Sequence, residues 1–230
     1  MSYLIVVAHP DDEVLGCGGT AAALTAAGHD VHCLIVCGDA EARQHRPSDE
    51  QLESDTLRSH AILGISPLAP GPFPNIRLNT VPHIEIVQFI EAAIQEVGAT
   101  RILTHHPHDL NDDHLHTSRA CQAAARLFQR RSDVPRLQSL HFIEVQSSTD
   151  WSFPGHSEPF RPDAFFEIRR AGVALKVKAL EAYQGVMRPY PHPRSLEAIE
   201  GLAAYRGGEA GMDYAEAFQT AFQTLTPPAR

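Results

Sequence analysis

Short apolar segments alternate with amphipathic ones through most of this chain, and the alternation restricts it to the α/β class of folds. Residues 3–8 form a continuous apolar run rich in β-branched side chains, as expected of a strand buried on both faces. A helical pattern follows over 14–27 and ends near Gly28, and a second apolar run covers 31–37. This strand–helix–strand order predicts a right-handed βαβ unit.

The same order continues along the chain. The polar stretch 38–49 is expected to be a loop, and Ser48 is a favoured N-cap for a helix that ends at Gly64. The proline-rich stretch 67–74 is expected to be an extended surface connection. Further helices are expected over 83–97, 115–130 and 171–184, strands over 101–104 and 140–145, and an irregular segment from Pro189 before a final helix over 213–223. We therefore expect a single Rossmann-like domain over residues 1–230, with a mostly parallel sheet, helices on both faces, and 189–230 as a C-terminal elaboration.

Composition excludes several classes of partner. With 28 acidic and 19 basic residues the chain carries a formal charge of −9, and it has no run of Lys and Arg that would hold nucleic-acid phosphates. No apolar stretch approaches the ~20 residues of a membrane span, and the N-terminus lacks the features of a signal peptide, so we expect a cytoplasmic protein. The 4 cysteines lack CxxC spacing and are expected to be reduced packing residues.

Side chains that bind metals gather after two of the expected strands. The first strand runs into His9-Pro10-Asp11-Asp12-Glu13, and the strand 101–104 runs into a stretch, 105–116, that holds 5 of the 14 histidines. Ligands of open α/β sheets bind beyond the carboxyl ends of the strands, and imidazole with carboxylate suits zinc, with other divalent transition metals fitting the same ligands. His9, one of Asp11 and Asp12, and one histidine of the second cluster would complete a catalytic zinc site. The remaining carboxylate could then accept a proton from water.

Each cluster also has a purely structural interpretation. The acidic residues after His9 could cap the following helix, which explains Glu13 well, and most histidines of the second cluster could belong to a polar loop. His114 stands out because it lies at the expected start of a helix, where a ligand is held rigidly. Residues 16–19, Gly-Cys-Gly-Gly, lack the spacing of a dinucleotide-binding loop, so close packing of helix on sheet explains them better.

The residues 7–20, Val-Ala-His-Pro-Asp-Asp-Glu-Val-Leu-Gly-Cys-Gly-Gly-Thr, resemble the N-terminal signature of the PIG-L/LmbE family of zinc-dependent N-acetylglucosaminyl deacetylases. A second family motif is matched by Pro107, Asp109, Asp113 and His114. Segments 144–151, 192–195 and 214–218 resemble parts of one bacterial branch, so the resemblance extends over nearly the whole chain.

The resemblance implies an enzyme, with His9, Asp12 and His114 as ligands of one Zn²⁺ per chain and Asp11 as the general base. The implied reaction is hydrolysis of the N-acetyl group of an amino sugar or sugar conjugate of the N-acetylglucosamine type, which releases acetate. It also implies a homo-oligomer, because relatives are often oligomeric.

The chain departs from the family pattern at two positions. Asn111 stands where the family often has a histidine. An asparagine can donate a hydrogen bond to an oxyanion but cannot carry a proton. The nearby His108 is a candidate to take over the proton transfer. Leu52 stands where a sugar-binding arginine is often found. Arg194 and His192 are therefore candidates for substrate contact, and a proline-bracketed structural turn is the alternative for them.

Two other functions use the same residues. A metal-dependent phosphoesterase would need a second metal ion and basic groups for the phosphate. A non-catalytic sugar-binding module would follow if Asn111 marked lost chemistry.

Overall fold

The computed structural model describes residues 1–38, 48–153 and 158–225. Its strands are β1 (Ser2–Val7), β2 (Asp30–Ile35), β3 (Ser66–Pro67), β4 (Arg101–His105), β5 (Ser139–Ile143), β6 (Ala164–Glu167) and β7 (Ala215–Gln223). Its helices are α1 (Asp12–Ala26), α2 (Asp49–Leu63), α3 (His83–Val97), α4 (Asp112–Ala124), α5 (Arg169–Glu181) and α6 (Leu196–Ala210), with short 3₁₀ turns η1 (Leu78–Thr80) and η2 (Leu127–Gln129).

All 7 strands form one sheet in the order β3-β2-β1-β4-β5-β7-β6. Strands β3, β2, β1, β4 and β5 are parallel, whereas β7 runs antiparallel to both β5 and β6. The predicted Rossmann-like α/β fold with a mostly parallel sheet is therefore confirmed.

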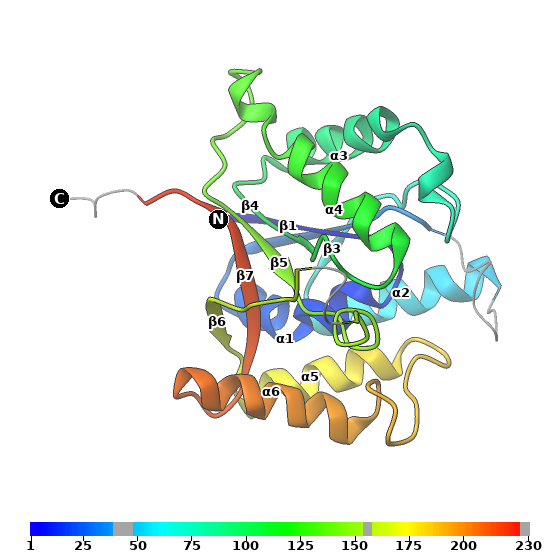
Figure 1. Ribbon diagram of the computed structural model, residues 1–230, viewed down its shortest axis with the longest axis vertical. Helices are drawn as coiled ribbons and strands as arrows, with labels where there is room; N and C mark the ends of the chain where they lie inside the picture. Colours follow the sequence, from blue (N-terminus) through cyan, green and yellow to red (C-terminus); the bar gives the residue numbers. More distant parts are fainter. Residues whose placement is uncertain (39–47, 154–157, 226–230) are drawn as a thin grey trace.

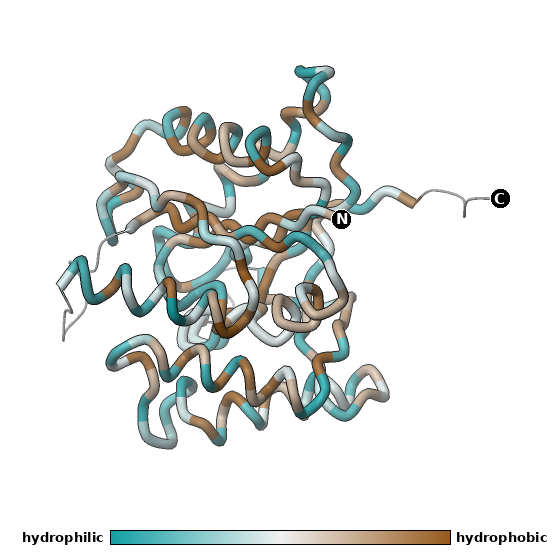
Figure 2. The backbone as a smooth tube through the Cα atoms, turned by 180° about the vertical axis from the view of Figure 1, so that it is seen from behind, coloured by the Kyte–Doolittle hydropathy of each residue, from teal (hydrophilic) through white to brown (hydrophobic). Residues whose placement is uncertain are grey.

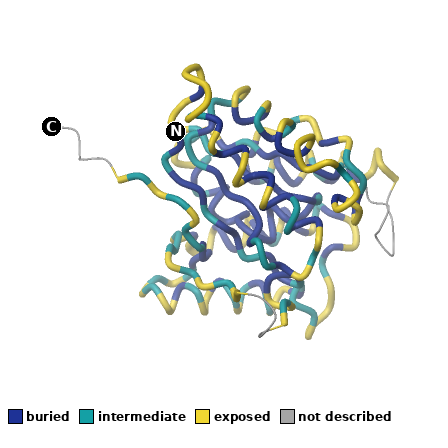
Figure 3. Tube along the Cα trace, turned by 45° about the horizontal axis from the view of Figure 1, so that its top comes forward, coloured by how far each residue is buried: buried dark blue, intermediate teal, exposed yellow. Residues whose placement is uncertain are grey.

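Helices cover both faces of the sheet (Figure 1). The α3–α4 pair lies on one face, and α1, α2 and α5 contact one another on the other, with α6 next to α5. Successive residues of β1 alternate between the two cores, because Ile5 and Val7 pack with the α1 side while Leu4 and Val6 pack with the α3–α4 side. This two-sided burial is why the strand reads as a continuous apolar run, and Figures 2 and 3 show apolar, buried segments through the centre of the molecule.

The helix boundaries predicted from capping residues agree well with the structure. Ser48 accepts a hydrogen bond from the backbone N–H of Gln51 at the start of α2, and Gly64 ends that helix with φ +73°. Helix α3 has the predicted bounds 83–97. The predicted loop 38–49 falls mostly outside the described residues, and no helix in the described part of the chain is long and apolar enough to cross a membrane.

The C-terminal part of the prediction is wrong in two places. The segment expected to be irregular contains α6, whose N-cap Ser195 accepts from the backbone N–H of Ala198, and residues 213–223 contain β7 instead of a helix. Phe218 and Phe222 have helical spacing, but pairing with β5 and β6 on either side outweighs the local pattern. Strand β6 was not predicted, and α4 begins three residues earlier than expected and ends at Ala124.

The glycine-rich segment of α1 packs closely, as predicted. A Cβ atom on Gly16 would lie 2.4 Å from Cδ1 of Ile143, and one on Gly19 would lie 2.8 Å from Cδ1 of Ile168. The helix is interrupted at Cys17, and the backbone N–H groups of Gly19 and Thr20 donate to the buried carboxylate of Glu216. All 4 cysteines are free and buried.

Candidate active site

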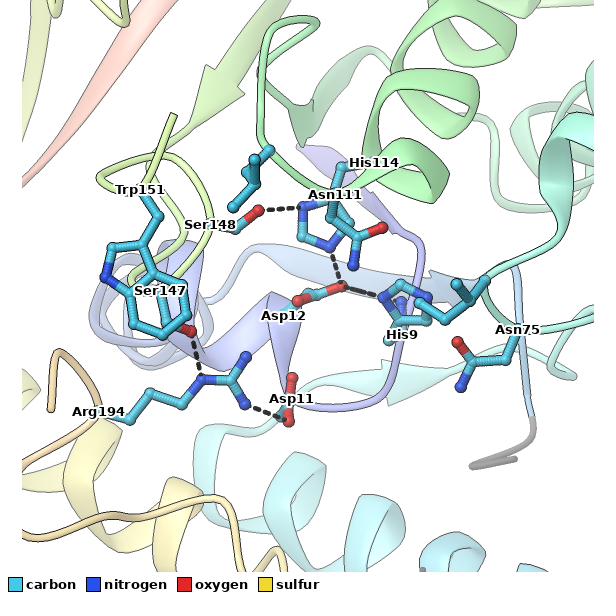
Figure 4. A pocket seen from close by; sticks show the side chains of 12 residues that line it. His9, Asp11, Asp12, Asn75, Asn111, His114, Ser147, Ser148, Trp151 and Arg194 are labelled. Carbon is cyan, nitrogen blue, oxygen red and sulfur yellow. Dashed lines mark hydrogen bonds and ion pairs between the residues drawn. The ribbon is translucent and has the colours of Figure 1, made fainter. Parts of the chain in front are cut away.

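The candidate site lies where the strand order reverses, at the carboxyl ends of β1 and β4. Such a switch point leaves a crevice between the loops that follow the two strands. A cavity of about 340 Å³ opens there, and Figure 4 shows the residues around it. Its walls come from the loop after β1, the start of α4, residues 75–76, the turn 147–151, and the segment before α6.

His9, Asp12 and His114 converge on the floor of this cavity. Oδ2 of Asp12 lies 3.3 Å from Nδ1 of His9 and 3.1 Å from Nε2 of His114, and one ligand atom from each residue falls within 4.8 Å of the others. Asp12 and His114 are 2 % exposed, and Asp12 is also held by the backbone N–H of His9. The structure thus brings together the three residues that the sequence predicts as metal ligands.

Each of the two histidines has a carboxylate on its other ring nitrogen. Nε2 of His9 lies 2.9 Å from Asp113, and Nδ1 of His114 lies 2.8 Å from Asp109. Metal-binding histidines typically have this arrangement, because a hydrogen bond to a carboxylate selects the tautomer and raises the basicity of the ligating nitrogen. This donor set fits a divalent transition metal.

The electrostatics of the cluster lead to the same conclusion. Burial opposes a charge on His114, but Asp12 and Asp109 outweigh it and raise its pKa to about 10. Burial likewise opposes the protonation of His9, yet the hydrogen bonds to Asp113 and Asp12 raise its pKa. The carboxylates of Asp12, Asp109 and Asp113 therefore favour positive charge at the two histidines, and the same negative field favours a bound cation.

His105 and Ser148 hold the ring of His114. The His105 ring stacks on it with centroids 3.7 Å apart, and Nε2 of His105 accepts the backbone N–H of Ala8. Burial lowers the pKa of His105 well below its usual value, so this imidazole stays neutral. The hydroxyl of Ser148 lies 3.3 Å from Nδ1 of His114.

Asp11 lies beside the cluster at the edge of the cavity, and its carboxylate pairs with Arg194. Its Oδ2 accepts from Nη1 of Arg194 at 3.2 Å, while Nε of Arg194 donates to Ser147 at 2.7 Å. Asp11 has φ +98°, a left-handed conformation that is rare for a residue with a side chain. Its side chain makes no capping hydrogen bond to α1, so the capping interpretation fails for this residue.

The other predicted site residues divide into two groups. Asn111 and Arg194 line the cavity. Oδ1 of Asn111 accepts the backbone N–H of Asp113 as the N-cap of α4, which leaves its NH₂ group as the donor for the cavity. His192 is not among the residues that line the cavity; its Nδ1 accepts the backbone N–H of Arg194 and its ring packs against Trp151, in agreement with the structural interpretation of this turn.

Two further positions are placed away from the cavity. His108 lines a separate cavity with His106 and Asp150. Leu52, at the position where the family often has an arginine, is 2 % exposed and packs in the core on the α1 side.

Several residues of the site carried no assigned role in the sequence prediction. Asp109 and Asp113 could have been found from their place in the second motif, since ligating histidines need carboxylate partners. Asn75 shows no local signal, and Trp151 is marked only by the resemblance of segment 144–151 to one bacterial branch. Both come from connections far from either cluster, and only the folded chain brings them to the cavity.

Comparisons with known proteins agree with this architecture. Residues 4–125 match the sequence model of the PIG-L family, described as GlcNAc-PI de-N-acetylase. A crystal structure of a conserved protein from Thermus thermophilus is similar at 28 % identity with a TM-score of 0.76, covering 99 % of this chain and 98 % of that one. A comparison with curated protein sequences finds no match.

Two less similar structures share the fold. The 4-carboxy-2-hydroxymuconate hydratase of Pseudomonas putida has 20 % identity and a TM-score of 0.76, over 100 % of this chain and 99 % of the hydratase. The N,N'-diacetylchitobiose deacetylase of Pyrococcus horikoshii has 16 % identity and a TM-score of 0.75, over 95 % of this chain and 83 % of the deacetylase. The fold thus occurs with both hydrolysis and hydration.

Proposed function

Because the chain belongs to the PIG-L family, we propose that it is a metal-dependent deacetylase that removes the N-acetyl group from an amino sugar or sugar conjugate of the N-acetylglucosamine type. The observation that carries this proposal is the position of Asp11 at the edge of a cavity whose floor holds His9, Asp12 and His114. A carboxylate next to three residues that can hold a metal, with the cavity open above both, is an arrangement suited to amide hydrolysis.

In this proposal His9, Asp12 and His114 hold one zinc ion, which when bound lowers the pKa of water and polarises the amide carbonyl. Asp11 accepts the proton of the attacking water and returns it to the nitrogen of the leaving amine. A C–O bond forms at the acetyl carbon, the C–N bond breaks, and acetate and the free amine leave. The amide NH₂ group of Asn111 stabilises the negative charge that develops on the carbonyl oxygen.

Arg194 has two roles in the proposal. Its pairing with Asp11 fixes the direction of the carboxylate, and the remaining N–H donors of the guanidinium can bind substrate hydroxyl groups. His192 supports the turn that carries Arg194, because its Nδ1 accepts the backbone N–H of Arg194.

The alternative of a phosphoesterase is less well supported by the cavity. Arg194 is the one Lys or Arg side chain among the described residues that line it, and Asp11 already pairs with it. A phosphate group needs more positive charge than this. The hydratase of the same fold remains a useful comparison, because hydration would need no acetamido group in the substrate.

The proposal is tested by acetate release from the zinc-loaded protein. The substrates are N-acetylglucosamine and its nucleotide, lipid and thiol conjugates, with a phosphate monoester and an unsaturated dicarboxylate as controls. Acetate release that Asp11→Asn abolishes supports the proposal. Turnover of either control without acetate release from any acetamido sugar overturns it.

Metal analysis of the purified protein tests zinc and its stoichiometry of one per chain. The homo-oligomeric state and the cytoplasmic location stay predictions, which light scattering and cell fractionation would check.

A further inference from the structure

The unusual backbone of Asp11 is held by its neighbour Glu13. The backbone N–H of Asp11 donates to Oε2 of Glu13 at 3.0 Å. Since a left-handed φ persists in a non-glycine residue only where the surroundings hold it, this hydrogen bond is a direct restraint on the Asp11 conformation.

Glu13 is itself held from the far side. It is fully buried, and its Oε1 accepts the hydroxyl of Tyr183 at 2.7 Å and lies 3.3 Å from Nε2 of His60. Tyr183 follows α5 and His60 belongs to α2, and both are 1 % exposed. Burial and the neighbouring Glu13 raise the pKa of Tyr183, so its hydroxyl remains a donor.

We infer that Glu13 is a positioning residue for Asp11, and that Tyr183 holds Glu13 in place from the far side. The inference rests on the proposed function, in which Asp11 is the general base. Glu13 does not line the cavity, so it acts through the Asp11 backbone and not on the substrate. If its carboxylate is lost, the peptide before Asp11 can rotate, and the Asp11 side chain leaves the direction set by Arg194.

This arrangement predicts a selective kinetic effect. The hydrogen bonds that order the metal ligands run through Asp12, Asp109 and Asp113, and Glu13 takes part in none of them. Loss of the hydrogen bond between Glu13 and the Asp11 backbone should therefore lower kcat, while KM and the amount of bound zinc stay near their wild-type values. A misdirected base slows proton transfer without weakening substrate binding.

Three variants test whether Glu13, held by Tyr183, positions Asp11. Tyr183→Phe removes one hydroxyl and should lower kcat roughly 10-fold, and Glu13→Ala should lower it on the order of 100-fold. Glu13→Gln keeps an oxygen that accepts the Asp11 N–H and should recover a large part of the loss. Hydrogen exchange of the Asp11 amide, followed by NMR, should accelerate in Glu13→Ala and stay slow in Glu13→Gln.

A matched control separates positioning from general loosening. Val186→Ala truncates a buried side chain of the same core that cannot form a hydrogen bond to Glu13, so it should lower stability and leave kcat unchanged. If Val186→Ala lowers kcat as much as Tyr183→Phe does, or if Glu13→Ala retains wild-type kcat, the inference is wrong.

Two further outcomes are informative. The first would separate the positioning role of Glu13 from the proposed deacetylase function, and the second would show that Glu13 binds a metal instead. Suppose that the zinc-loaded wild type releases no acetate, but that protection of the Asp11 amide from hydrogen exchange still depends on Glu13. The proposed function is then wrong, and the positioning of Asp11 by Glu13 is still supported. One ligand atom each of Glu13, Cys33 and His60 also lies within 4.8 Å of the others. If zinc beyond one equivalent binds and inhibits wild type, and His60→Ala removes both effects, Glu13 belongs to a second metal site and the inference is overturned.

Discussion

Nε2 of His9 lies 2.9 Å from Oδ2 of Asp113, although 104 residues separate the two in sequence. Asp113 also accepts the backbone N–H groups of Ile76 and Leu78, so one carboxylate ties the loop after β1 to α4 and to the connection after β3. The orientation of His9 thus depends on three separate parts of the chain.

Asp113→Asn should weaken zinc binding about 10- to 100-fold, because the imidazole of His9 loses its carboxylate partner. Competition with a chromogenic chelator measures the affinity. Asp112→Asn is the matched control, since the Asp112 side chain is 52 % exposed and pairs with His116, away from the metal-ligand cluster. Equal zinc affinity in the two variants would argue against the His9–Asp113 contact.

Asp11→Asn should keep its zinc and lose roughly 10²- to 10⁴-fold in kcat, because a neutral amide cannot accept the proton of water. Metal content and acetate release, measured on the same preparation, check both parts. Wild-type turnover in this variant would remove Asp11 from its role, and loss of zinc would show that it acts as a ligand.

Substitutions at Asn111 should separate its two contacts. Asn111→Ala should lower both kcat and stability, the latter by about 0.5–2 kcal/mol for a lost N-cap. Asn111→Ser should keep the cap of α4 and lower only kcat, because its short hydroxyl no longer reaches the cavity. Thermal unfolding and steady-state kinetics distinguish these outcomes, and an unchanged kcat in Asn111→Ser would contradict the oxyanion role.

The buried pair Lys176–Glu216 should support α1 across its break at Cys17. Nζ of Lys176 donates to Glu216 at 2.8 Å and to the carbonyl of Leu15 at 2.7 Å. Lys176→Met should therefore lower the free energy of unfolding by about 3–5 kcal/mol, since it leaves the Glu216 carboxylate buried without its cation. Urea denaturation measures the change, and Lys176→Met combined with Glu216→Gln should recover part of it.

The cysteine thiols should be unreactive in the folded protein. Burial raises the pKa of Cys121 to about 12, and burial together with nearby Glu216 and Glu13 raises that of Cys17 well above its usual value. Because the thiolate is the reactive form, Ellman's reagent at pH 8 should label these thiols slowly in buffer and fast in denaturant. Fast labelling of the folded protein would show that this core opens readily.

Much of this fold could be predicted from the sequence. Apolar runs such as 3–8 belong to strands buried on both faces. Caps such as Ser48 and Gly64 act on backbone groups of their own helix, so local chemistry determines both kinds of feature. The same holds for placing His9 and the segment that leads to His114 after the carboxyl ends of two parallel strands, which lie at the same edge of the sheet.

Only the tertiary structure decided the remainder. Residues 215–223 became a strand because β5 and β6 offer backbone partners on both sides, which no local pattern reveals. The placing of Arg194, and not His192, at the cavity was decided there. So were the contact of His9 with Asp113 and that of Tyr183 with Glu13, which join residues distant in sequence. The physical reason is that local sequence encodes propensity and capping, whereas a contact across the fold depends on how every element between its two residues packs.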